Sequence, residues 1–460
     1  MREHELYPDA RNLMESTRSI GYSLPAAVAD IVDNSIAAGA ACVQIDTPTG
    51  NDRRLLILDD GVGMDKDELF VAMRYGSRFV HEQRREGDLG RFGLGLKMAS
   101  LSQCRCLTVL SKKKDGTIVG ARWDLDHIAE SAHQWALLVL SSRDINKVPW
   151  ADKLSQQESG TLVVWEKLDQ LLKGIKERGL PEVLVERTEE LMDHLSLVFH
   201  RYLEGEGGSN LTIEFNGGAL EPADPFLKKL SQRPFAPDTY HCGKDKILIQ
   251  PFILPHPKLL SAEDKRRAGD LQKDQGFYVY RNKRLVIWGT WFRLSRKLEL
   301  SKLARVMVDI PASADIDDQW SLDVKKSNAT IPEELKESLR AVVRRLSDRS
   351  GQVWKRRAWV ERSDDAFWNR EKHDEGYVTF SINMENPTVK DFLQKMPELK
   401  SLFVLLSAAL PLDSIYTDLA SNETVTTDNS DLDSAVQSLK ALGIDDSAIE
   451  GLLNTLRGRK

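Results

Sequence analysis

Two polar residues near the start of the chain have a spacing that could do chemistry. Asp30 and Asn34 are four positions apart in the segment Pro25–Ser35, and on a helix that spacing puts both side chains on one face. A carboxylate and a carboxamide that converge there could orient a water and ligate Mg²⁺, which prefers oxygen ligands and keeps several waters. A solvated helix face is the alternative for this pair taken alone.

A second segment, Leu55–Met64, ends an apolar run with Asp59-Asp60-Gly61-Val62-Gly63. The run predicts a strand that delivers Asp59 at its end, where the glycines let the backbone turn sharply and admit a flat ligand. A buried aspartate can accept a hydrogen bond from an exocyclic amine, which would select adenine. An ordinary Asp-Gly turn is the alternative.

A glycine-rich loop at residues 87–97 precedes an apolar helical run. Glycines ahead of a helix expose backbone N–H groups to an anion, and the helix dipole favours negative charge there. The loop is not a P-loop, because Leu96 separates Gly95 from Lys97, and Met98 stands where a dinucleotide fingerprint needs its third glycine. The pattern indicates phosphate binding of another kind.

The elements that must position these residues divide the chain. Residues 1–200 alternate helical and β-rich segments, which predicts an α/β layered domain; its expected strands are 41–46, 54–58, 105–111, 117–125 and 161–166. A strand-rich domain at 201–350 follows, with expected strands at 211–217, 246–250, 276–280 and 305–309 and a closing helix at 333–345. We expect a helical region at 351–420, a polar linker at 421–430 and a short helical tail at 431–460.

Composition places the chain among ordinary globular proteins. It has 460 residues, 41% hydrophobic and 29% charged, with a net charge of −6, so any surface for nucleic acid must be local. No signal peptide and no uncharged window of about 20 residues is present, which predicts a cytoplasmic protein without a membrane span. The four cysteines lack a CxxC pair, which favours reduced thiols.

The order of these motifs, followed by Gly160-Thr161 at the start of another apolar strand, resembles the GHKL ATPases: gyrase B, Hsp90, histidine kinases, MutL and MORC proteins. The strings Asp33-Asn34-Ser35 and Gly90–Lys97 are most similar to MORC and related bacterial Hsp90-like ATP-binding proteins. Over residues 15 to 330, the resemblance implies an α+β fold: a Bergerat-type α/β sandwich ATPase domain, then a ribosomal S5-like transducer domain, with a helical C-terminal region beyond it.

The resemblance also implies roles for single residues. Asn34 would ligate the Mg²⁺ of bound ATP, Asp59 would bind the adenine amine, and Thr161 would support the adenine end. A mobile lid would run from about Arg74 to Gly95. The further positions implied in nucleotide binding are Gly61, Gly63, Met64, Gly90, Gly93, Leu94, Gly95, Leu96 and Lys97.

One position departs from the family pattern. The general base four residues before the asparagine is usually Glu, whereas this chain has Asp30. A displacement of roughly 1 Å can cost on the order of 100-fold in rate, so hydrolysis could be slow or the water could be placed differently. Asp33 is a second candidate for the base, although on a helix it points about 100° away from Asn34.

The second domain contains strings similar to the transducer of this superfamily, among them Gly276–Leu285, Val308–Pro311 and Trp320–Ser327. In such enzymes a lysine of the last loop reaches the γ-phosphate. Lys325 is the candidate, with Lys326 beside it, and a solvated lysine pair is the alternative. The resemblance implies that ATP orders the lid and closes a homodimer, which hydrolysis reopens.

Two basic stretches could bind double-stranded DNA. Residues 281–305 contain eight basic residues, one acid and interleaved aromatics, and residues 340–357 form a second basic run on an expected helix. A core with solvated charges, or a helix surface with ion pairs, is the alternative. The C-terminal region could dock partner proteins.

The leading hypothesis is therefore a MORC-like, ATP-driven homodimeric clamp on DNA. A role in bacterial defence is implied by the resemblance alone. An Hsp90-like chaperone, or a nucleotide-gated binding module with negligible turnover, is the alternative. A histidine kinase is less well supported because a transducer-like domain follows. A MutL-type nuclease is also less well supported, because the C-terminal part of this chain lacks a recognisable metal motif.

Overall fold

The computed structural model divides the chain into two compact units, Met1–Ser350 and Gly351–Lys460. The residues that it describes are 8–19, 21–48, 53–75, 95–131, 135–171, 180–233, 235–242, 245–313, 316, 319–320, 330–358, 368–372, 378–397 and 437.

The first unit contains an eight-stranded sheet with the strand order β5-β4-β3-β6-β2-β1-β7-β8. Its strands are β1 (Cys42–Asp46), β2 (Leu55–Asp59), β3 (Cys106–Lys112), β4 (Val119–Asp124), β5 (Leu138–Val139), β6 (Gly160–Glu166), β7 (Thr212–Phe215) and β8 (Gly218–Ala219). Neighbouring strands are antiparallel, except that β1 and β7 are parallel.

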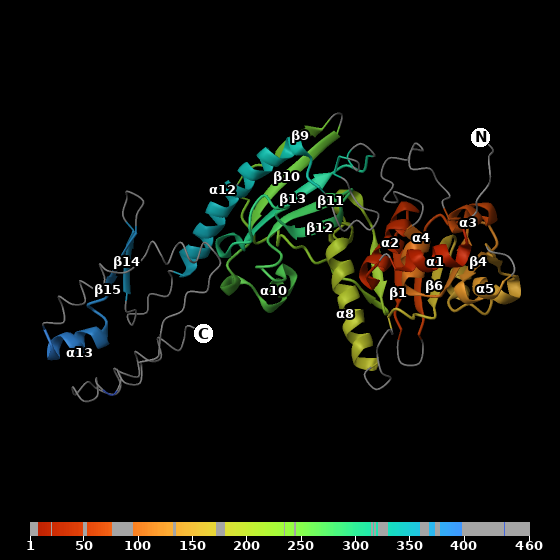
Figure 1. Ribbon diagram of the computed structural model, residues 1–460, viewed down its shortest axis with the longest axis horizontal. Helices are drawn as coiled ribbons and strands as arrows, with labels where there is room; N and C mark the ends of the chain where they lie inside the picture. Colours follow the sequence, from red (N-terminus) through yellow and green to blue (C-terminus); the bar gives the residue numbers. More distant parts are fainter. Residues whose placement is uncertain are drawn as a thin grey trace. The chain divides into compact units, whose positions relative to one another are not determined.

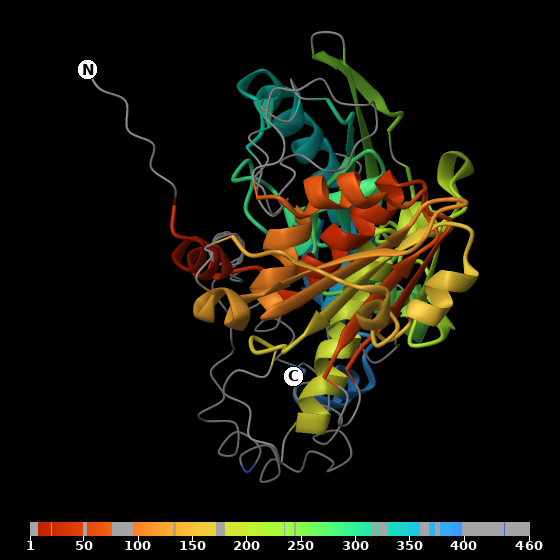
Figure 2. The ribbon, with the colours of Figure 1, turned by 90° about the vertical axis from the view of Figure 1, so that its right-hand side faces the viewer.

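Both faces of this sheet are covered by helices. The larger face packs against α1 (Ala10–Arg18), α2 (Leu24–Ala37), α3 (Lys66–Met73), α4 (Gly95–Gln103), α5 (Leu125–Glu130) and α8 (Leu180–Val198), which share one hydrophobic core with it; Figure 2 shows the N-terminal helices against the sheet. Short helices α6 (Ser142–Ile145) and α7 (Ala151–Gln156) cover the other face.

Strand β2 illustrates why the sheet is a middle layer. Alternate residues belong to different cores, with Leu55 and Ile57 facing the larger core and Leu56 and Leu58 the smaller one. A run of four apolar residues without alternation is the pattern of a strand buried on both faces. The predicted α/β sandwich is confirmed in this part of the chain.

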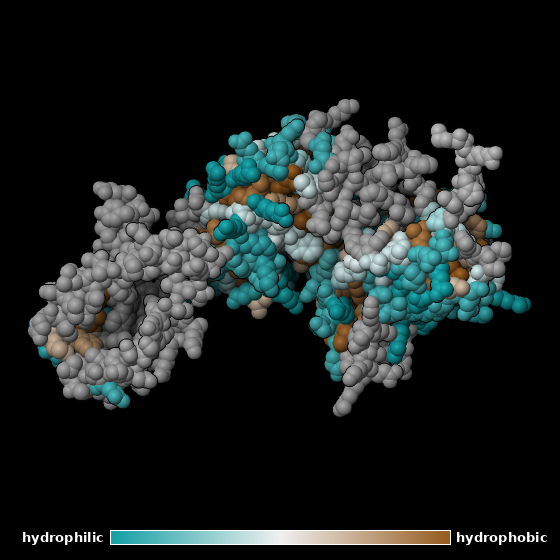
Figure 3. Space-filling model, in the orientation of Figure 1, coloured by the Kyte–Doolittle hydropathy of each residue, from teal (hydrophilic) through white to brown (hydrophobic). Residues whose placement is uncertain are grey.

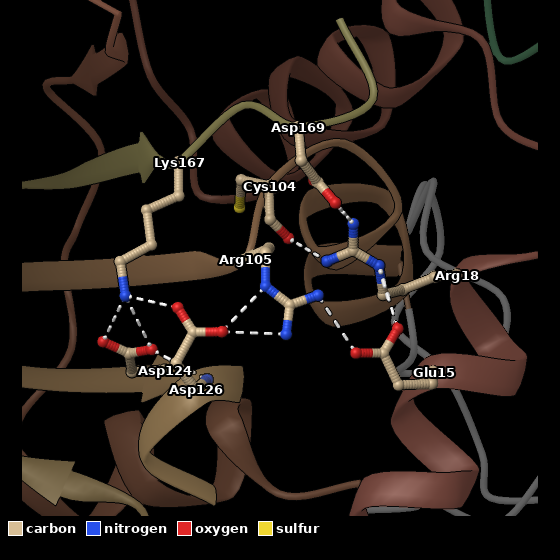
Figure 4. A network of polar contacts seen from close by, with 8 residues as sticks. All are labelled: Glu15, Arg18, Cys104, Arg105, Asp124, Asp126, Lys167 and Asp169. Carbon is tan, nitrogen blue, oxygen red and sulfur yellow. Dashed lines mark hydrogen bonds and ion pairs between the residues drawn. The ribbon is translucent and has the colours of Figure 1, made fainter. Parts of the chain in front are cut away.

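A polar network fastens α1 to the sheet (Figure 4). Arg18 of α1 donates from Nη1 to the Cys104 carbonyl at 2.9 Å and from Nη2 to the Asp169 carboxylate at 2.6 Å. Arg105 bridges Glu15 to Asp126, at 3.1 and 2.8 Å, and Lys167 extends the network to Asp124 and Asp126. The network therefore joins α1, the residues between α4 and β3, the end of β4, α5 and the segment after β6.

A second, five-stranded sheet follows in the same unit, with the order β12-β11-β13-β10-β9 (Figure 1). Its strands are β9 (Asp238–Cys242), β10 (Asp245–Ile253), β11 (Gly276–Arg281), β12 (Arg284–Thr290) and β13 (Ala304–Ile310). Strands β11 and β13 are parallel and the other pairs antiparallel. Three of the four strands predicted for residues 201–350 lie in this sheet as β10, β11 and β13. The fourth, predicted at 211–217, forms β7 and pairs with β1 in the first sheet instead, so the first sheet extends past the predicted boundary at residue 200. The likeness of the second sheet to an S5-like transducer stays a prediction.

The helical elements of the first unit from residue 200 onward are short, apart from one helix. They are α9 (His200–Leu203), η2 (Glu206–Gly208), η3 (Pro257–Leu259), α10 (Ala262–Ala268), η4 (Glu299–Ser301) and α12 (Glu333–Ala358). The charged helix α10 forms part of the hydrophilic surface in Figure 3. Helix α12 runs well past the predicted end at Arg345, because neither glycine nor proline occurs before Gly351 and a single glycine in a helix costs only about 1 kcal/mol.

The second unit corrects part of the sequence prediction. Within the region 351–420, expected to be helical, β14 (Trp368–Lys372) and β15 (Val378–Ile382) form an antiparallel pair, and α13 (Pro387–Lys395) follows. The β15 sequence alternates β-branched or aromatic residues with hydroxyl residues, which suits a strand better than a helix. The predicted linker at 421–430 lies outside the described residues, as does the tail at 431–460 apart from residue 437.

Among the residues that the structure describes, no helix combines the length and the apolar character needed to cross a membrane.

Candidate functional site

Helix α2 carries the first pair of predicted residues. The helix begins at a capped turn in which the Ser23 hydroxyl accepts a hydrogen bond from the Ala26 N–H. Asp30 is buried, with 6% of its surface exposed, and its Oδ2 accepts a hydrogen bond from the Tyr22 hydroxyl at 3.1 Å. Asn34 lies one turn further along and is exposed. The helix thus presents a fixed carboxylate and an accessible carboxamide, as the spacing predicts.

Asp59 stands at the end of β2 in a buried polar pocket. Its Oδ2 accepts a hydrogen bond from the Ser35 hydroxyl at 2.8 Å, and its Oδ1 accepts from the Gly61 and Thr161 N–H groups at 3.0 and 3.2 Å. Burial raises the pKa of Asp59 above its usual value, and these three hydrogen bonds offset only part of that effect. The carboxylate is therefore oriented by α2, by its own turn and by β6.

Two glycines of the turn after Asp59 are required by close contacts. A Cβ on Gly61 would stand 2.8 Å from the Ala38 Cβ and 3.1 Å from Asp59 Oδ1. Gly63 has φ +66°, and a Cβ there would stand 2.0 Å from the Lys112 carbonyl oxygen. The turn is packed so tightly between α2 and β3 that only glycine fits at either position.

Sequence reasoning missed two residues that organise this pocket. Ser35 follows Asn34 directly and orients Asp59. Ser111, on β3, accepts a hydrogen bond from the Met64 N–H at 2.8 Å and lies 2.9 Å, hydroxyl to hydroxyl, from Thr161. Ser35 belongs to the motif string and could have been found by pairing it with the buried aspartate, whereas no local signal singles out Ser111.

The predicted phosphate-binding loop is described only at its end. Gly95 begins α4, Leu96 packs against the larger core, and α4 packs against α2. Lys97 is buried, and its Nζ donates to the Ala72 carbonyl at 2.8 Å. The other predicted residues of the loop, Gly90, Gly93 and Leu94, lie outside the described residues, as do Lys325 and Lys326.

Asp33, the second candidate for a general base, has a different role in the structure. Its carboxylate forms an ion pair with Arg284 of β12, with Nε 3.0 Å from Oδ2, and both side chains are buried. A carboxylate held in such a pair is not available to deprotonate a water, so Asp30 stays the candidate on this helix.

The residues of this pocket fit ATP and Mg²⁺. An adenine amine would meet the Asp59 carboxylate, whose surroundings are already hydrogen-bonded, and Gly61 and Gly63 add no side chains of their own to the turn beside it. The exposed Asn34 carboxamide offers one oxygen ligand to Mg²⁺, a cation that takes its other ligands from phosphates and water.

A carboxylate at the end of a sheet strand, an Asp/Asn pair on the covering helix and a glycine at the start of α4 are the described features that the sequence resemblance implies for a nucleotide site in an α/β sandwich. Residues 22–161 match the sequence model of the family described as histidine kinase-, DNA gyrase B- and HSP90-like ATPase. This part of the chain is a GHKL ATPase domain, and the family-level prediction is confirmed.

Similar proteins among curated sequences include DNA mismatch repair proteins MutL. That of Halobacterium salinarum is 32% identical over 102 residues, covering 22% of this chain and 16% of the relative. That of Shewanella denitrificans is 38% identical over 92 residues, which cover 20% of this chain and 14% of the relative. That of Leptospira biflexa is 32% identical over 116 residues, which cover 24% of this chain and 18% of the relative. The chain thus matches less than a fifth of the length of each of these relatives, and the finer likeness to MORC stays a prediction.

Proposed function

We propose that the chain is a Mg²⁺-dependent ATPase that acts as a nucleotide-gated homodimeric clamp, of MORC type, on DNA. The observation that carries the proposal is the Asp59 pocket, in which a buried carboxylate is oriented by three donors beside the helix that bears Asp30 and Asn34. The family match supports the ATPase part. The clamp, the DNA and a role in bacterial defence rest on the resemblance and on the surface described below.

In this proposal the chain's own residues divide the work. Asp59 and Thr161 hold the adenine end, and Gly61, Gly63 and Met64 form the turn beside it. Asn34 holds Mg²⁺, which neutralises charge on the triphosphate when bound. The loop from Gly90 to Lys97, with Gly93, Leu94, Gly95 and Leu96, binds phosphates through backbone N–H groups at the start of α4.

Asp30 is proposed as the general base. Burial and the hydrogen bond from Tyr22 keep its carboxylate in one orientation, from which it would accept a proton from the attacking water. Because aspartate is one methylene shorter than glutamate, we expect slow turnover. Lys325, with Lys326 next to it, is proposed to contact the γ-phosphate, so that the triphosphate favours the closed homodimer.

The two candidate DNA-binding stretches differ in how much of their basic character is exposed. In residues 281–305, Arg281, Arg284 and Arg305 are buried, and Trp291 is buried too, so much of this stretch belongs to the protein interior. On α12, by contrast, Arg340, Arg344 and Arg349 are exposed, while Leu339, Val342, Val343 and Leu346 are buried. The basic face of α12 is therefore the better candidate for phosphate contacts.

A second candidate function is a nucleotide-gated binding module with negligible turnover, which the aspartate at position 30 favours. ATP hydrolysis and Mg-ATP binding by wild type, Asp30→Ala and Asn34→Ala, with and without double-stranded DNA, separate the two. The clamp predicts turnover that DNA changes and that both variants lose. Binding without turnover under either condition would favour the switch, and no nucleotide binding by the wild type would refute both.

A further inference from the structure

A buried ion pair joins the nucleotide-site helix to the second sheet. Arg284 is the first residue of β12, and its Nε lies 3.2 Å from Oδ1 and 3.0 Å from Oδ2 of Asp33 on α2. The side chains are only 5% and 1% exposed. Such a pair is strongly held, because removing either partner leaves a charge buried without compensation.

The surroundings of the pair hold Arg284 in one orientation. Its Nη1 donates to the Leu285 carbonyl at 2.7 Å, and its guanidinium lies 5.7 Å from the centre of the Phe199 ring. The ring of His194, on α8, packs 5.7 Å from that of Trp288 on β12. Burial and the Arg284 cation lower the pKa of His194 to about 3, so the imidazole is neutral and does not compete with Arg284 for Asp33.

The turn between β11 and β12 is also held by the first domain's helices. The Tyr202 hydroxyl of α9 donates to the Asn282 carbonyl at 2.6 Å, and Lys283 Nζ donates to the Glu206 carbonyl of η2 at 2.8 Å. The hairpin that begins β12 is therefore fixed at its turn as well as at Arg284. A displacement of α2 cannot occur without strain at this hairpin.

We infer that Arg284 is a positioning residue for the nucleotide site and that the Asp33–Arg284 pair couples α2 to the second sheet. Asp33 lies between Asp30 and Asn34 on the same helix, so a side chain anchored to β12 fixes the rotation and the axial position of the turn that presents both. The inference rests on the proposed ATPase function. On this inference, nucleotide binding affects the second sheet through the Asp33–Arg284 contact, which lies outside the phosphate-binding loops.

The experiment uses the full chain with four variants: Arg284→Met, Arg284→Lys, the apolar pair Asp33→Leu/Arg284→Met, and Arg293→Met as a control on an exposed arginine near the same strand. Each is measured for thermal stability, for the Kd of a non-hydrolysable Mg-ATP analogue and for kcat. Hydrogen exchange of residues 276–310 is measured with and without the analogue. The apolar pair separates stability from positioning, because matched apolar replacement of a buried ion pair is often neutral for stability.

We expect the apolar pair to regain the stability that Arg284→Met loses, with the Kd changed by less than about 3-fold and kcat reduced by about 10-fold or more. The analogue should alter exchange in residues 276–310 of the wild type, Arg284→Lys and Arg293→Met, and leave it unaltered in the apolar pair. Wild-type kcat and exchange response in the apolar pair would overturn the inference, as would a wild type that binds the analogue without any exchange response. Failure of the wild type to bind the analogue would instead refute the proposed function itself.

Discussion

The surroundings of Asp59 decide which ligand this pocket suits. A buried carboxylate is costly unless it is paired or hydrogen-bonded, and here Ser35, Gly61 and Thr161 supply three donors. Even so, burial keeps the pKa raised. A carboxylate in this condition gains from a further donor, and an exocyclic amine of adenine is such a donor.

The raised pKa predicts a pH dependence of nucleotide binding. Because the ionised carboxylate is the better acceptor, affinity for Mg-ATP should fall as pH decreases from about 7.5, beginning above the ordinary carboxyl value of about 3.9. The stability contribution of Asp59 has the opposite sign, since a raised folded-state pKa stabilises the fold at low pH and that contribution is lost as pH rises through it. Calorimetric titration across this range tests the first effect.

Ser35→Ala is the matched variant for that titration. Removing its hydroxyl deletes a hydrogen bond to ionised Asp59, so the fall in affinity should begin at a higher pH than in the wild type. Asp59→Asn should bind weakly at every pH. An affinity that is flat in the wild type over this range would contradict the assignment of Asp59 to the adenine amine.

The turn at Gly63 predicts a stability cost. Gly63→Ala would place a Cβ 2.0 Å from the Lys112 carbonyl at φ +66°, and the strain should lower the free energy of unfolding by about 1–3 kcal/mol. Gly218→Ala is the control, because its Cβ would be 3.7 Å from the nearest atom, the Phe215 carbonyl oxygen, and its effect should stay within about 0.5 kcal/mol. Urea unfolding measures both, and equal effects would contradict the close contact.

At the scale of elements, the sequence predicts the strands themselves better than the long-range contacts between elements. The strands β1, β2, β3 and β6 were predicted to within a residue or so, because their apolar runs are bounded by turns. Asp30, Asn34 and Asp59 were predicted as site residues because their spacing carries a local signal. The ion pair of Asp33 with Arg284 spans 251 positions, and the two residues come together because β12 packs against α8, which in turn packs against α2.

The hairpin β14–β15 was missed for a similar reason. A strand of five residues beside charged segments gives weak periodicity, whereas the long basic run before it favours a helix, which does form as α12. Trp368 pairs with Ile382, 14 positions further along the chain, and the periodicity of neither short strand signals that pairing.

The contact between α8 and β12 predicts how stability changes with pH. Burial and the nearby Arg284 cation, partly offset by Asp33, lower the pKa of His194 to about 3 from a usual 6.5. A lowered histidine pKa means that the unfolded chain binds the proton more readily. This contribution to stability is therefore complete above pH 6.5 and is lost as pH falls towards about 3, with a slope of up to about 1.4 kcal/mol per pH unit.

His194→Gln removes that contribution, so its free energy of unfolding should vary less with pH between 6.5 and 4 than that of the wild type. His241→Gln, on an exposed histidine of β9, is the control and should keep the wild-type slope. Chemical unfolding at a series of pH values measures the three proteins. Equal slopes in wild type and His194→Gln would show that the imidazole is not kept neutral by burial beside Arg284.

At the scale of the whole molecule, the proposed clamp predicts a change of oligomeric state. Mg²⁺ with a non-hydrolysable ATP analogue should convert monomer to dimer in light scattering after gel filtration, because the proposed clamp makes its γ-phosphate contacts only in the closed state. Asn34→Ala should remain monomeric under the same conditions, and Lys325→Ala should bind the analogue and dimerise poorly. A wild type whose mass is independent of nucleotide would contradict the gating.

The distribution of basic residues leads to the last prediction, which concerns DNA. Arg340 and Arg344 are exposed one helical turn apart on α12, whereas Arg293 and Arg296 are exposed in the other basic stretch. Each phosphate contact contributes about 0.9 to the slope of log K against log salt. The double variant Arg340→Gln/Arg344→Gln should therefore weaken binding to double-stranded DNA and reduce that slope by about 2, with little dependence on DNA sequence.

The control for this prediction is Arg293→Gln/Arg296→Gln, which makes the same change in net charge and should leave the slope close to that of the wild type. If the second variant loses the slope and the first keeps it, DNA binds along residues 281–305 despite the buried arginines there, and if neither changes it, both surfaces are excluded as the DNA-binding face.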